Sequence, residues 1–114
     1  YSIELITNYL DINTKFKISS ISYSDTQSLK KENRLIAISK IEKASDYINP
    51  IGGKEIYTKK VFLEQKLNLH FLETKPIKYK QFDSKFVPWL SIIDVLMFNS
   101  KEDTLQLINN YQLI

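Results

Sequence analysis

The middle of the chain alternates helix-like and strand-like segments, and this alternation constrains the fold more than any other feature. Apolar side chains spaced three residues apart predict an amphipathic helix over Lys31–Ala44, followed by a brief strand at Tyr47–Asn49. A second helix is predicted at about Lys54–Lys66, with a break near Thr58, and a strand at Leu67–Glu73, where apolar and polar residues alternate. Strands that alternate with helices of this length are typical of βα repeats. We therefore predict an α/β domain with a mostly parallel sheet of about three strands flanked by helices.

The beginning of the chain extends this pattern. Apolar residues close to one helical face predict a helix at residues 2–10, and alternation predicts a strand at Thr14–Ser22. The polar segment Tyr23–Leu29 is predicted to be a loop. Because the chain starts at Tyr1 and enters a helix almost at once, we expect residues 1–114 to form a single α/β domain that is the C-terminal fragment of a longer protein.

The longest apolar run, Phe86–Phe98, predicts a buried helix that is hydrophobic nearly all round, with Pro88 in its first turn. Ser100, followed three residues later by Asp103, has the pattern of an N-terminal cap. It predicts a last amphipathic helix that runs through Tyr111. The chain should thus end in a buried helix followed by an amphipathic one.

Composition excludes several classes of function. With 114 residues, 43% of them hydrophobic, the chain can bury one small core. The absence of cysteine excludes disulfide frameworks and thiol nucleophiles, and a single histidine argues against His-rich metal sites and a Ser/His triad. No metal site is expected, although Mg²⁺ held by one or two carboxylate oxygens stays open. The net charge is +3, but the basic residues are interspersed with acidic ones, so no nucleic-acid partner is expected.

The hydropathy of the sequence gives no sign of a membrane-spanning segment. No apolar run reaches the roughly 18 residues of a membrane helix, because Ser91 and Asp94 interrupt the longest one. The first residues have no signal-peptide pattern. We therefore expect no membrane insertion and a cytoplasmic location.

The segment Tyr47–Lys54 is the first candidate binding element. In an open parallel sheet, ligands bind at the carboxyl ends of the strands, and a glycine-rich turn into a helix offers free amides to anionic oxygens. Asn49, Gly52 and Gly53 would form such a turn, and Lys54 would add a positive charge. The spacing is not that of a P-loop. The alternative is a turn that needs glycine only for its backbone angles.

Ser91 and Asp94 are the candidate catalytic residues. They lie three residues apart and so share one face of a predicted apolar helix. A carboxylate there needs a partner, for which the sequence offers Arg34, Tyr79 and Lys80. In a cleft Asp94 would act as a general base. The alternative is a structural aspartate whose pairing only fixes the packing.

The residues around this predicted helix are rich in aromatic and amide side chains: Tyr79, Gln81, Phe82, Phe86, Trp89 and Asn99. Such a set suits the binding of a sugar or a nucleobase, but it also makes an ordinary core or a subunit interface. His70 is predicted to face away from Leu69 and Phe71. No Ser or Cys at motif spacing supports a catalytic role for it.

Four segments resemble, in order and spacing, the C-terminal part of WbqC-like proteins: Tyr47–Tyr57, Leu69–Leu72, Tyr79–Phe82 and above all Phe86–Ser100. The helix containing Asn33–Ile38 resembles the segment that precedes them in that family, so residues 30–114 match well and residues 1–29 loosely. The resemblance adds Tyr57 and Pro88 to the candidate site. It also includes the residues already singled out, which are Asn49, Gly52, Gly53, Tyr79, Gln81, Phe82, Trp89, Ser91, Asp94 and Asn99.

The resemblance implies a bacterial protein involved in the biosynthesis of O-antigen or another surface polysaccharide. Acyl or aminoacyl transfer to a nucleotide-linked amino sugar would suit that setting, and no cofactor is indicated. On this hypothesis the Gly52–Gly53 amides hold an anionic group, Tyr79 and Trp89 pack on a sugar or base, and Asp94 is the base, all in one cleft. The alternative is a non-catalytic interaction module of a polysaccharide assembly complex, in which the aromatic segment forms a protein interface, including that of a homo-oligomer.

Overall fold

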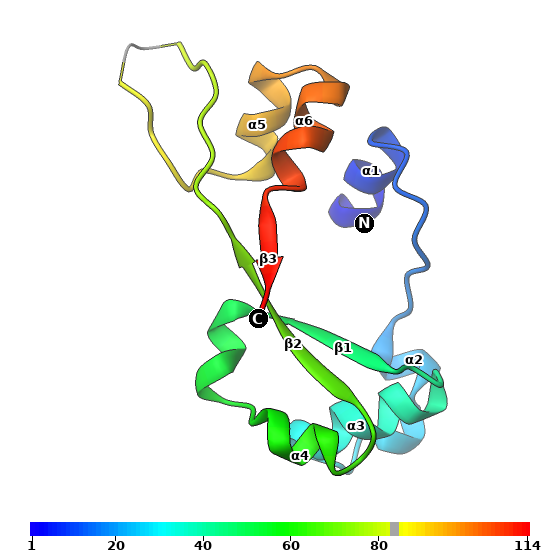
Figure 1. The fold of residues 1–114 in the computed structure, drawn as a ribbon. Helices are drawn as coiled ribbons and strands as arrows, with labels where there is room; N and C mark the ends of the chain where they lie inside the picture. Colours follow the sequence, from blue (N-terminus) through cyan, green and yellow to red (C-terminus); the bar gives the residue numbers. More distant parts are fainter. Residues whose placement is uncertain (83–84) are drawn as a thin grey trace. The chain divides into compact units, whose positions relative to one another are not determined.

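The computed structural model describes residues 1–82 and 85–114, which form two compact units. Unit 1 consists of Tyr1–Lys15 and Thr74–Gln112, and unit 2 consists of Phe16–Glu73 and Leu113–Ile114. The order of the elements along the chain can be followed in Figure 1.

Unit 2 contains the alternating elements predicted for the middle of the chain. Its regular elements are the helices α2 (Ser19–Ser22), α3 (Lys31–Ile41) and α4 (Lys59–Leu63), the short 3-10 helices η1 (Ser24–Thr26) and η2 (Ile51–Glu55), and the strands β1 (Asp46–Pro50) and β2 (Asn68–Thr74), whose last residue belongs to unit 1. The predicted break near Thr58 is confirmed, because Thr58 precedes the first residue of α4.

The sheet is mixed. β1 and β2 pair in parallel, in a register that runs from Asp46 opposite Asn68 to Pro50 opposite Leu72. A third strand, β3 (Tyr111–Leu113), follows β2 in the strand order. Phe71 and Ile114 exchange backbone hydrogen bonds of 2.8 and 3.0 Å, a reciprocal pair that marks antiparallel pairing. The α/β class is therefore confirmed, whereas the prediction of a mostly parallel sheet holds only for β1 and β2.

The core of unit 2 lies where α3 and α4 pack against one face of β1 and β2 (Figure 1). Phe62 of α4 is fully buried at its centre, with Leu69 and Phe71 of β2 buried beside it. The ring of Tyr47 stacks on Phe62 at a centroid distance of 5.8 Å, and that of Tyr57 meets it edge-on at 6.2 Å. Phe62 thus packs against the apolar face of the sheet and against two partly buried tyrosines.

Unit 1 contains three helices among its described residues: α1 (Ser2–Tyr9), α5 (Ile92–Phe98) and α6 (Lys101–Ile108). The predicted cap is confirmed, because the Ser100 Oγ accepts a hydrogen bond of 3.1 Å from the backbone N–H of Asp103. α6 ends at Ile108, however, and Tyr111 begins β3. The extension of the last helix to Tyr111 was wrong, because the two asparagines that follow Ile108 favour a turn over a helix.

The single buried helix predicted at Phe86–Phe98 is also wrong. Pro88 disfavours helical angles at the residue before it, and Trp89 has a φ of 61°, in the left-handed region. The helix begins only after Ser91, whose Oγ accepts a hydrogen bond of 3.2 Å from the Ile93 amide. Of the residues in α5 only Val95 is buried, whereas Met97 is 76% exposed.

The strand predicted at Thr14–Ser22 is wrong as well. Residues 13–18 have no regular structure, and α2 occupies Ser19–Ser22. The apolar side chains that suggested a buried face are exposed: Phe16, Ile18 and Ile21. Alternation predicts a strand only if a neighbouring strand accepts its backbone hydrogen bonds, and none of the described strands does so here.

None of the helices in the described part of the chain is long and apolar enough to cross a membrane.

Candidate functional site

Asp94 is the centre of a side-chain hydrogen-bond network in unit 1. The Tyr79 hydroxyl donates to Asp94 Oδ2 at 2.5 Å, and Gln81 Nε2 donates to the same oxygen at 3.0 Å. Gln81 also holds the backbone of Val87, accepting from its amide at 2.8 Å and donating to its carbonyl at 3.1 Å. The network therefore fastens Tyr79, Gln81 and Val87 to Asp94 in the first turn of α5.

Tyr79 confirms one of the three partners proposed for Asp94. Arg34, another of them, lies in unit 2, where its Nε donates to Thr26 Oγ1 at 3.3 Å. Burial, followed by the bond to Asp94, raises the pKa of the Tyr79 hydroxyl above its usual value of 10.0. The hydroxyl therefore keeps its proton at neutral pH and acts as the donor to the carboxylate.

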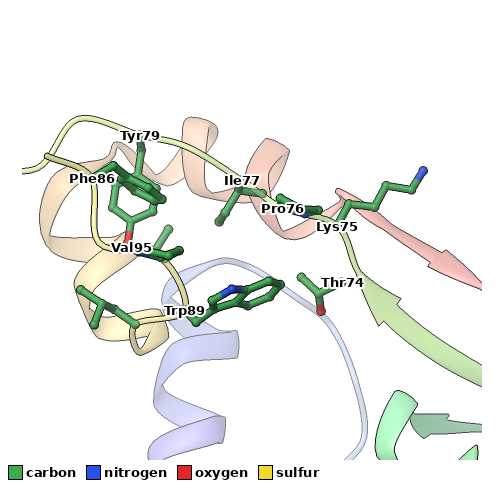
Figure 2. A pocket seen from close by; sticks show the side chains of 10 residues that line it. Thr74, Lys75, Pro76, Ile77, Tyr79, Phe86, Trp89 and Val95 are labelled. Carbon is green, nitrogen blue, oxygen red and sulfur yellow. The ribbon is translucent and has the colours of Figure 1, made fainter.

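An aromatic and apolar pocket of about 230 Å³ lies against this network (Figure 2). Figure 2 shows the Tyr79 and Phe86 rings side by side near Val95, with the Trp89 indole extending toward Thr74 and Pro76. The remaining lining residues are Lys75, Ile77, Pro88 and Leu90. Tyr79 and Phe86 meet edge-on at a centroid distance of 5.2 Å. This pocket, called the aromatic pocket below, is formed entirely within unit 1.

Trp89 has two unusual properties. Its side chain is 74% exposed although it lines the aromatic pocket. Its φ of 61° is a conformation that a bulky residue rarely adopts and that costs roughly 1–3 kcal/mol. Residues in such strained conformations cluster at ligand-binding and catalytic sites.

A second, smaller cavity of about 190 Å³ adjoins the carboxylate side of the network. Its walls include Gln81, Lys85 and Asp94, together with Leu90, which also lines the aromatic pocket. Tyr79 thus faces one cavity and Asp94 the other. Of this hydrogen-bonded pair, only Tyr79 lines the aromatic pocket.

The other predicted site residues of this segment have local roles. Ser91 is the N-terminal cap of α5, and Asn99 Nδ2 donates to the Val95 carbonyl at 2.7 Å, near the end of the same helix. Phe82 is 94% exposed and meets the Phe98 ring edge-on at 4.6 Å. At the start of α5, Ser91 therefore caps the helix, and Asp94 in its first turn binds the side chains of Tyr79 and Gln81.

The predicted turn Asn49–Lys54 lies in unit 2, where it forms the end of β1 and the helix η2. Neither Gly52 nor Gly53 has a positive φ, so backbone angles do not explain the glycines. Gly53 is buried against Asn49, whose Oδ1 accepts from the Tyr47 hydroxyl at 3.0 Å. Sequence reasoning missed Tyr47 as a partner of Asn49, although the two-residue spacing on one strand could have indicated it.

A comparison with family models identifies the chain. The model of the WbqC-like protein family matches residues 1–106. This chain belongs to that family. No curated protein and no solved structure matches it. The match includes residues 1–29, where the sequence resemblance was loose, and nearly all of both units of this WbqC-like chain.

The predicted cleft joined the turn at Asn49–Lys54 to the helix with Ser91 and Asp94. These two halves lie in different units of the WbqC-like chain, so their meeting in one cleft stays a prediction. Within unit 1 the structure brings Tyr79, Gln81 and Asp94 together. Within unit 2 it brings Asn49, Gly53 and Tyr57 together.

Gly53 gives a direct stability prediction. A Cβ at position 53 would lie 1.8 Å from Asn49 Nδ2 and 2.9 Å from its Cγ, so the amide would have to leave both Tyr47 and the Pro50 carbonyl. Gly53→Ala is expected to lower the free energy of unfolding by about 1–3 kcal/mol, as measured by urea denaturation. Gly52→Ala is the matched control, since nothing lies within 4 Å of its Cβ. An equal loss in both variants would show that the close approach is not the cause.

His70 pairs with Asp46 across β1 and β2, with Nε2 2.8 Å from Oδ1. It faces away from the buried Leu69 and Phe71, as predicted. Among residues 1–82 and 85–114, no three His, Asp or Glu side chains gather into a metal-ligand set. His70 is thus one member of a cross-strand pair at the start of the sheet.

This pair predicts a pH dependence of stability. Hydrogen bonds from Ser45, His70 and Asn68 lower the pKa of Asp46 below its usual value of 3.8. A lowered pKa contributes stability that is present above the unfolded-state pKa, about 3.9, and is lost as the pH falls through the folded-state pKa. Between pH 6 and pH 3 the urea midpoint of the wild type should therefore fall further than that of Asp46→Asn. Identical losses in the two proteins would contradict a stabilising role for the carboxylate.

Proposed function

We propose that this protein transfers an acyl or aminoacyl group to the amine of a nucleotide-linked sugar in the biosynthesis of a bacterial surface polysaccharide. The observation that carries the proposal is the Tyr79–Asp94 hydrogen bond at the wall of the aromatic pocket. It joins a carboxylate able to accept a proton to the hydroxyl of a tyrosine that lines the space where a small group can bind.

The pocket suits one ring rather than a whole nucleotide sugar. Its volume of about 230 Å³ is below the roughly 300–1,000 Å³ typical of pockets for drug-sized ligands. The exposed Trp89 indole offers a flat apolar face on which a sugar ring can pack. Trp89 presents this indole from a backbone position with a φ of 61°, the kind of conformation found at ligand-binding sites.

The network provides a route for the proton that the transfer releases. The amine nitrogen attacks the carbonyl carbon of an activated acyl donor, and the bond to the donor's leaving group breaks with its electron pair. The ammonium proton passes to the Tyr79 oxygen while the Tyr79 proton passes to Asp94 Oδ2, along the existing 2.5 Å hydrogen bond. Asp94 then returns a proton to the leaving group through the same hydroxyl. Gln81 keeps Asp94 aligned during both steps.

Trp89 is the sole tryptophan of the chain and reports on binding directly. Titration with a UDP-linked amino sugar should quench its fluorescence in a saturable way, because the sugar ring covers the indole. UDP alone is the control and should leave the signal nearly unchanged. Equal quenching by UDP would contradict the proposal that the pocket takes the sugar ring.

A second candidate function is that of a non-catalytic interaction module. It is favoured by apolar side chains of unit 1 that are exposed on and near α5: Phe82 at 94%, Met97 at 76% and Ile93 at 62%. As an interface, this surface should give a concentration-dependent mass in sedimentation that Met97→Lys abolishes. A monomer that responds to the amino sugar would instead support the transferase.

A further inference from the structure

A third cavity, of about 310 Å³, lies in unit 2 and is lined by Lys54, Tyr57, Thr58, Lys59, Phe71 and Ile114. None of these residues lines the aromatic pocket, so an inference about this cavity does not depend on the transferase proposal. The Gly52–Gly53 turn was expected to present the anion site, but neither glycine lines this cavity. Any ligand of this cavity would therefore be bound by other residues than the Gly52–Gly53 amides.

The wall is cationic. It carries two lysines and no acidic side chain. Neither Lys54 nor Lys59 forms an ion pair with a carboxylate in the part of the chain that the structure describes. No carboxylate among residues 1–82 and 85–114 therefore competes with a ligand for these ammonium groups, and the Thr58 and Tyr57 hydroxyls can donate hydrogen bonds to it.

The charges, the apolar side and the volume of the cavity together indicate which class of ligand it can bind. Lysine binds phosphate as a point charge, and two lysines with two hydroxyls suit more than one phosphoryl group. The partly buried Tyr57 ring adds an apolar side to the cavity, which a bare anion would not use, and Phe71 lies behind it in the core. The volume of about 310 Å³ falls within the range of small-molecule sites.

We propose that the cavity formed by Lys54, Tyr57, Thr58 and Lys59 binds the diphosphate of a nucleotide. The phosphoryl oxygens lie between the two ammonium groups, and the nucleoside lies toward the partly buried Tyr57 ring, because Phe71 is only 3% exposed. The site orients a diphosphate ligand by charge at one end and by apolar contact at the other.

The test is a calorimetric titration of the full chain with UDP, with inorganic pyrophosphate as a second probe. UDP should bind more tightly than pyrophosphate, and the double variant K54A/K59A should weaken UDP binding about tenfold or more. The matched control is K30A/K60A, which removes the same charge, since Lys60 follows Lys59 in α4 but does not line the cavity. It should bind UDP within about twofold of the wild type.

Three outcomes would overturn the proposal: no binding of UDP at millimolar concentration, equal weakening in both double variants, or pyrophosphate binding as tightly as UDP. Circular dichroism of each variant establishes that it is folded. Asp94→Asn should leave UDP binding unchanged, so a failure of the transferase proposal and a failure of this site would be distinguishable.

Discussion

Phe62→Ala is expected to lower the free energy of unfolding by about 3–5 kcal/mol, the range typical of phenylalanine truncation in a packed core. Phe62 is fully buried and contacts the rings of both Tyr47 and Tyr57. Its removal would leave a cavity between α4 and the apolar face of β1 and β2. Small domains have only about 5–15 kcal/mol of stability, so the variant should be close to unfolding near body temperature.

The neighbouring Leu63 provides the control. Leu63→Ala removes an apolar side chain from the next position of the same helix, but this side chain is 65% exposed. Its effect should stay within about 0.5 kcal/mol. Urea denaturation followed by circular dichroism measures both. A loss of less than about 1 kcal/mol in Phe62→Ala would show that the core forms elsewhere.

Asp94→Asn is expected to lower turnover by about 10²–10⁴-fold, because the amide cannot accept the proton that Tyr79 passes on. The fold should tolerate the change. The amide oxygen of asparagine can still accept from Tyr79 and Gln81, the two donors that reach Asp94 Oδ2. The free energy of unfolding should therefore fall by no more than about 1 kcal/mol.

Glu102→Gln is the matched control for Asp94→Asn. It replaces an exposed acid in the first turn of α6 by its amide, so it should leave turnover unchanged and lower the free energy of unfolding by no more than about 1 kcal/mol. The assay follows acylation of a UDP-linked amino sugar with an activated acyl donor. A large loss of stability in Asp94→Asn, with turnover lost only in proportion to the unfolded fraction, would instead show that Asp94 does no more than fasten the preceding residues to α5.

Local patterns predicted α3, β1 and β2 of unit 2 well. The alternation in β2 reflects the burial of Leu69 and Phe71, and that periodicity is readable from the sequence. In α3 the helix was predicted correctly, but its three-residue apolar spacing ends at Ile41, which is 56% exposed. Alternation at Thr14–Ser22 failed because a strand depends on a partner strand, which lies elsewhere in the sequence. β3 was missed for a similar reason, since its pairing through Ile114 and Phe71 joins residues far apart in the chain.

The candidate site could be predicted only in part. The aromatic and amide residues around position 94 led to the correct choice of Tyr79, Gln81 and Asp94 as neighbours. The continuous apolar run Phe86–Phe98, however, led to a helix start several residues too early. The Ser91-x-x-Asp94 spacing is a capping pattern, and read as such it would have placed the start of the helix correctly. The role of Gly53 could not be predicted, because a side chain of Asn49 fills the space that a Cβ would need.

The order in which the chain builds its two units has a consequence for its synthesis. Unit 1 needs both Tyr1–Lys15 and Thr74–Gln112, whereas Phe16–Glu73 supplies all of unit 2 except its last two residues. A ribosome adding roughly 5–20 residues per second therefore releases most of unit 2 seconds before α5 and α6 exist. During that interval α1 has no partner from its own unit, and β2 lacks its antiparallel neighbour. Phe71 can complete its backbone pairing only when Ile114, the final residue of this sequence, has been made.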